Sequence, residues 1–137
     1  MMARKPKAVV LDSWAVLAYL GGEASGQEVA DLIAGAHESG IPMCMSVINA
    51  GEVWYILARE ISEAQADQAM ADLRGLGIEV IDADWPLTRL AAAFKAHRKM
   101  SYADCFAAAL AKERKAELVT GDKEFKQVEA EVSVRWV

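Results

Sequence analysis

The sequence predicts an α/β fold, a three-layer α/β/α sandwich around a parallel sheet of about five strands. Short apolar runs alternate along the chain with longer segments whose apolar residues recur at helical spacing. Right-handed crossovers between parallel strands place such helices on both faces of the sheet. The chain has 137 residues, which suits one domain. We therefore expect a single domain over residues 1–137, with its core at about 8–136.

Five short segments are expected to be strands. The first is an apolar run closed by Asp12, and the last alternates between apolar and polar residues, as an edge strand does. The expected strands are residues 8–11, 41–45, 78–81, 117–120 and 132–136.

Helices are expected between these strands, and most begin after a serine or aspartate that can cap the first turn. Glycines stop several of them. The expected caps are Ser13, Ser46, Ser62, Asp84 and Ser101. The expected helices are residues 14–20, 27–38, 47–59, 63–74, 85–98 and 102–115, with a short helical turn at 123–127.

The composition restricts the possible functions. A net charge of -5 argues against binding nucleic acid through a broad basic face, although bound divalent cations would reverse the local field. Cys44 and Cys105 lie in apolar segments without metal-ligand spacing, so we expect buried thiols in a reducing cytoplasm. The longest uncharged stretch, residues 39–51, is shorter than the roughly 20 residues of a membrane span. No signal peptide is recognisable either, and a cytoplasmic protein without a membrane segment is predicted.

Four carboxylates are expected to meet at one edge of the sheet. Asp12 and Asp122 directly follow the first and fourth strands. Glu52 lies near the start of the helix that leaves the second strand, and Asp104 lies near the start of the helix that leads into the fourth. All four therefore share the carboxyl edge, where parallel α/β sheets bind their ligands.

Glu52 has an unusual position in its helix. At about 100° per residue, it falls between Ile48 and Ile56 on the apolar arc. A buried carboxylate without a partner is costly, and no lysine or arginine lies one turn before it. We therefore expect a bound cation there, with Asn49 orienting Glu52 by hydrogen bonding.

Three of the acids also have ordinary structural explanations when each is taken alone. Asp12 can cap a helix, Asp122 can belong to a turn, and Asp104 can form a capping box with Ser101. A shared cation explains the four acids together better than separate roles do. The set contains no histidine or cysteine, so one or two Mg²⁺ or Mn²⁺ ions are expected rather than zinc.

At these residues the chain resembles the PIN-domain ribonucleases, particularly the VapC-like toxins of toxin-antitoxin pairs. Four segments carry the resemblance in order: VVLDS at 9–13, SVINAGEV at 46–53, SYAD at 101–104 and LVTGDKEF at 118–125. The resemblance implies a sheet of order 3-2-1-4-5 and metal-dependent hydrolysis of RNA phosphodiester bonds. It assigns catalysis and metal binding to Asp12, Glu52, Asp104 and Asp122, with Ser13, Asn49 and Thr120 as polar neighbours. Glu124 is a possible fifth acid.

The resemblance also implies partners. Besides RNA, it implies a second copy of the chain in a homodimer and a small antitoxin protein that covers the acidic site. No base-reading motif is present in the sequence. Arg98, Lys99 and the N-terminal basic cluster of Arg4, Lys5 and Lys7 are candidate RNA contacts, or simply solvated charges.

Other functions stay open at this point. A haloacid-dehalogenase-type phosphatase needs a second aspartate two residues after the first, where this chain has Trp14. A structure-specific DNA nuclease of the same fold is an alternative, although the long insertions of such enzymes are missing. A non-catalytic module that binds a cation or a basic peptide is the other. Glu52 distinguishes the ribonuclease from the binding module, because only an enzyme loses RNA cleavage when this acid is neutralised.

Overall fold

A five-stranded parallel sheet forms the centre of the computed structural model, which describes residues 6–137. The strand order is β3-β2-β1-β4-β5, and each neighbouring pair is parallel. The predicted fold class and strand order are confirmed. The strands are β1 (Val9–Leu11), β2 (Met43–Ser46), β3 (Ile78–Ile81), β4 (Glu117–Thr120) and β5 (Ser133–Trp136).

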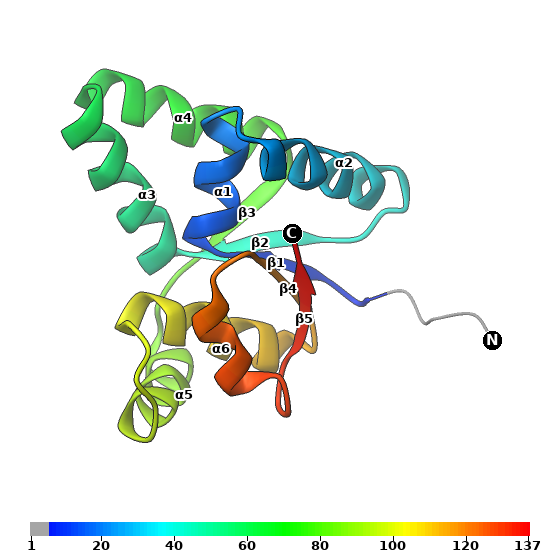
Figure 1. The fold of residues 1–137 in the computed structure, drawn as a ribbon, viewed down its shortest axis with the longest axis vertical. Coiled ribbons are helices and arrows are strands. Elements are labelled where there is room, and N and C mark those ends of the chain that lie inside the picture. Colours follow the sequence, from blue (N-terminus) through cyan, green and yellow to red (C-terminus); the bar gives the residue numbers. More distant parts are fainter. Residues whose placement is uncertain (1–5) are drawn as a thin grey trace.

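Helices cover both faces of the sheet (Figure 1). The first four helices pack on one face, whereas the last two and a short 3-10 helix pack on the other. Val9 and Leu11 point to the first face and Val10 to the second, which explains why the strand is a continuous apolar run. The helices are α1 (Ser13–Leu20), α2 (Ala24–Glu38), α3 (Val47–Glu60), α4 (Glu63–Gly75), α5 (Trp85–Ala96), α6 (Tyr102–Arg114) and η1 (Lys123–Val128).

The predicted helix caps are confirmed with one exception. The side chains of four cap residues accept a hydrogen bond from the backbone N–H three residues on: Ser46, Ser62, Asp84 and Ser101. The prediction for α1 was wrong, because Asp12 caps this helix and Ser13 is its first residue. Asp12 keeps the extended backbone of the strand, so its carboxylate can reach the N–H of Ala15.

Several predicted ends differ from the observed ones. The prediction that α2 begins at residue 27 was wrong, since it begins at Ala24. Gly26 there lies so close to α1 that a Cβ atom would be 2.4 Å from the carbonyl oxygen of Ala18. The close crossing of α1 and α2 thus fixes a turn of helix that local pattern does not show. Helix α5 ends at Ala96, before the predicted 98.

Cys44 and Cys105 are both buried and free, as predicted. Within residues 6–137, none of the helices has the length and apolar character needed to cross a membrane.

Gly26 gives a test of the α1–α2 crossing. Gly26→Ala should lower the free energy of unfolding by roughly 1–3 kcal/mol, because the added methyl group meets backbone atoms that cannot yield easily. The matched control is Gly35→Ala in the same helix, where a Cβ atom meets nothing within 4 Å. That change should raise stability by about 0.5–1 kcal/mol. Urea unfolding measures both, and equal effects of the two variants would contradict the proposed close contact.

Candidate active site

The four predicted acids lie together at the carboxyl edge of the sheet. Asp12 follows β1, Asp122 follows β4, Glu52 comes from α3 and Asp104 from α6. The last three line a cavity of about 480 Å³, and Asp12 is buried with only 1% of its surface exposed. The cavity is lined by Ser13, Trp14, Leu17, Glu52, Ile56, Lys99, Ser101, Asp104, Asp122 and Glu124.

Hydrogen bonds hold the Asp12 carboxylate from both sides. Its Oδ1 accepts from the backbone N–H of Ala15 at 2.8 Å, and its Oδ2 accepts from the Thr120 hydroxyl at 2.5 Å. The Thr120 oxygen in turn accepts from the backbone N–H of Asp122 at 3.0 Å. The ends of the neighbouring strands β1 and β4 are therefore linked through the acid itself.

Asn49 ties together the three helices that meet at the site. Its Nδ2 donates to the Ser13 hydroxyl and to the carbonyl oxygen of Ala103, both at 3.1 Å. Its Oδ1 accepts from the Ser46 hydroxyl at 2.6 Å. These bonds use both amide hydrogens. The expected hydrogen bond from Asn49 to Glu52 is therefore not formed. It instead fixes the starts of α3 and α6, the helices that carry Glu52 and Asp104.

The expected burial of Glu52 on an apolar helix arc was wrong. Glu52 is only partly buried, and the neighbouring Ile48 is 36% exposed. The side of α3 that faces the core consists of Asn49, Ala50 and Val53 instead. The arc of Glu52 faces the cavity, where Ile56 forms part of the wall. Asp12, rather than Glu52, is the deeply buried acid.

Burial and mutual repulsion raise two pKa values in the site. The pKa of Asp12 is raised from 3.8 to about 7, chiefly by desolvation on burial. The hydrogen bonds from Thr120 and Ala15 lower it, and the charges of Asp122 and Glu52 raise it further, to this net value. Burial also raises the pKa of Asp104 to about 7, followed by the negative charges of Asp122, Asp12 and Glu52 and a hydrogen bond shared with Asp122. The four acids thus interact electrostatically.

The donor set of the cavity fits a hard divalent cation. All four acids offer oxygen ligands, as Mg²⁺ and Mn²⁺ require. In the part of the chain that the structure describes, the only salt bridge joins Arg98 to Glu131, so none of these acids is neutralised by a lysine or arginine. As they stand, however, no three His, Cys, Asp or Glu side chains among residues 6–137 are arranged to hold a metal ion. The four acids lie close together, but their carboxylate oxygens are not in the positions of metal ligands.

Sequence reasoning missed one wall of the cavity. The Trp14 ring lies against the backbone of Gly121, where a Cβ atom would be 2.3 Å from the indole. Gly121 therefore provides space for an aromatic ring from α1, a requirement beyond an ordinary turn. In the sequence, the position of Gly121 between Thr120 and Asp122 was the signal that could have indicated this close contact. Glu124, the possible fifth acid, does line the cavity.

The raised pKa values predict how stability depends on pH without bound metal. Between about pH 4 and pH 7 the folded state holds more protons than the unfolded state, so the free energy of unfolding should fall as pH rises through this window. Asp12→Asn removes one of the two titrations and should make this fall smaller. Urea unfolding in a chelator checks both. Asp31→Asn, an exposed change on α2, should keep the wild-type dependence, and a flat wild-type profile would contradict the expected repulsion.

Comparison with known proteins agrees with the fold. The family model of the PIN domain matches residues 9–131. No curated protein matches the chain significantly. Similar solved structures include VapC20 of Mycobacterium tuberculosis, described as a Sarcin-Ricin loop cleaving toxin (20% identity, TM-score 0.68, covering 88% of this chain and 95% of that one).

Two further structures are similar in fold. VapBC-1 from nontypeable Haemophilus influenzae has 17% identity and a TM-score of 0.72, over 94% of this chain and 97% of that one. A toxin-antitoxin complex from Klebsiella pneumoniae has 18% identity and a TM-score of 0.67, over 93% and 96%. At these identities the likeness concerns the fold. Because the family model spans nearly the whole described chain, the chain belongs to the PIN domain family.

Proposed function

We propose that the protein is a metal-dependent ribonuclease, the toxin of a toxin-antitoxin pair, formed by a single nuclease domain over residues 1–137. One observation carries the proposal. Asp12 is a buried carboxylate held between β1 and β4, and three further acids gather around it at the open edge of the sheet. No structural role requires such a concentration of like charge.

The four acids would hold the cation. Asp12, Glu52, Asp104 and Asp122 would ligate one or two Mg²⁺ or Mn²⁺ ions. When bound, such an ion activates water and stabilises the charge that develops on the phosphate. Thr120 and the N–H of Ala15 keep the Asp12 carboxylate oriented towards the site.

A carboxylate of the cavity would also move the proton. Asp104 lines the cavity, so one of its carboxylate oxygens would take the proton of an attacking water. Asp122 lines the same cavity and is the second candidate for this role. No side chain needs to act as a nucleophile.

The toxin role and the partners rest on the relatives. The family is that of the PIN domain, and the similar structures include a toxin that cleaves the Sarcin-Ricin loop and a toxin-antitoxin complex. We extend this to the present chain. A small antitoxin protein would cover the acidic cavity, and two copies of the chain would form a homodimer.

A cleavage assay on RNA tests the proposal. Wild-type protein with Mg²⁺ or Mn²⁺ should cut single-stranded or structured RNA, and a chelator should stop it. Asp12→Asn and Glu52→Gln should each lower kcat about a hundredfold or more, because each removes a ligand of the ion. Glu113→Gln is the matched control, since Glu113 is an exposed acid at the far end of α6 from Asp104.

The same assay separates the alternatives. Cleavage of branched or single-stranded DNA but not RNA would identify a DNA nuclease of the same fold. If the wild type binds a divalent cation but cleaves neither RNA nor DNA, the protein is a non-catalytic module. Equal activity of the wild type, Asp12→Asn and Glu52→Gln would contradict the assignment of the site.

A further inference from the structure

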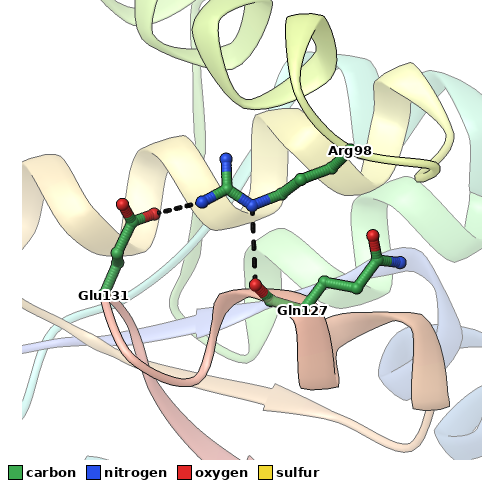
Figure 2. A network of polar contacts seen from close by, with 3 residues as sticks. All are labelled: Arg98, Gln127 and Glu131. Atoms are coloured by element: carbon green, nitrogen blue, oxygen red, sulfur yellow. Dashed lines mark hydrogen bonds and ion pairs between the residues drawn. The ribbon is translucent and has the colours of Figure 1, made fainter.

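The loop that joins α5 to α6 is held tightly against η1. Arg98 Nη2 donates to Glu131 Oε2 at 2.9 Å, and its Nε donates to the carbonyl oxygen of Gln127 at 3.5 Å (Figure 2). The guanidinium also lies over the Phe94 ring, 4.9 Å from its centroid. Arg98 is therefore used to anchor the loop. Because its guanidinium is already bonded within the protein, Arg98 is a poorer candidate for an RNA contact than Lys99.

The side-chain amide of Gln127 fixes the backbone of Lys99. Gln127 Oε1 accepts from the N–H of Lys99 at 3.3 Å, and Gln127 Nε2 donates to the Lys99 carbonyl oxygen at 3.4 Å. The second hydrogen of Nε2 goes to Glu124 Oε2 at 2.9 Å. Both amide hydrogens are thereby used. Glu124, an acid of the cavity wall, is bound to this amide.

Lys99 itself lines the acidic cavity. Among the residues that line it, Lys99 is the one basic side chain, beside Glu52, Asp104, Asp122 and Glu124. The described residues include no salt bridge that joins Lys99 to any of these acids. Its ammonium group is therefore available to a negatively charged ligand at the edge of a site that otherwise repels one.

We propose that Lys99 binds a backbone phosphate of the RNA, and that Gln127 and Glu124 are positioning residues that hold the loop carrying Lys99. The inference rests on the proposed ribonuclease function and names a residue that brings its substrate to the acids. It also gives Glu124 a role different from that of a fifth metal ligand. Of the N-terminal basic cluster, Arg4 and Lys5 lie outside the described residues, and Lys7 precedes β1 at the opposite edge of the sheet.

The test measures binding and cleavage of a single-stranded RNA oligonucleotide. Lys99→Gln should raise KM and the dissociation constant roughly fivefold, with the effect on KM rather than kcat. The slope of log Kd against log salt should fall by about 0.7, as expected for one lost phosphate contact with a single strand. Lys99→Arg should restore most of the affinity. The charge-matched control Lys7→Gln should leave affinity and salt slope as in the wild type.

A double-mutant cycle tests the positioning role. Gln127→Ala, a neutral change at an exposed residue, should raise KM about twofold to threefold in the wild type. It should add nothing in the Lys99→Gln background, because Gln127 acts through Lys99. A purely structural role of Gln127 would instead give the same change in both backgrounds.

The outcomes separate this inference from the proposed function. If the wild type cuts RNA but Lys99→Gln behaves like Lys7→Gln, the role of Lys99 is overturned and the ribonuclease stands. If the wild type neither binds nor cuts RNA, both are overturned. A loss of kcat without a change in KM would also overturn the inference, since it would place Lys99 in the chemical step.

Discussion

The buried carboxylate of Asp12 is the constraint on which the site depends. It ends β1, caps α1 through the N–H of Ala15, and accepts a hydrogen bond from Thr120 at the end of β4. One side chain thus joins β1, the central strand, to its neighbour β4 and starts the first helix. Because Thr120 also accepts from the N–H of Asp122, the position of a second acid follows from the same contact. The geometry of the edge is therefore built from backbone and hydroxyl donors, which leaves the acids without cationic partners among the described residues.

The clustered acids that the proposed function requires lower the stability of the folded protein. Desolvation and like charge raise the pKa values of Asp12 and Asp104 to about 7, so the ionised site costs free energy of folding. Other contacts stabilise the structure around the site. Asn49 fixes three helices by satisfied hydrogen bonds, and α6 packs its alanines into the core beneath the site. Concentrated charge on a rigid frame is typical of a site that binds a cation and a phosphate.

The sequence predicts the fold and the gathering of the acids because both follow from local signals. Apolar runs closed by Asp12 or by Gly121 and Asp122 mark strand ends, and parallel topology brings these ends to one edge. Tertiary contacts decide the rest. The start of α2 depends on the fit of Gly26 against Ala18, and helical period alone does not show whether the arc of Glu52 faces the core or a cavity. The contact of Gln127 with Lys99 joins residues 28 positions apart, and no local pattern shows it.

The central claim is that the acidic quartet holds a divalent cation. Calorimetric titration of Mn²⁺ into metal-free protein near neutral pH measures this without any substrate. Wild type and Glu113→Gln should bind saturably with the same affinity, at one or two ions per chain. Asp12→Asn and Glu52→Gln should bind roughly tenfold to a hundredfold more weakly, since each removes an oxygen ligand. Saturable binding with equal affinity in all four proteins, or no saturable binding by the wild type, would contradict the claim.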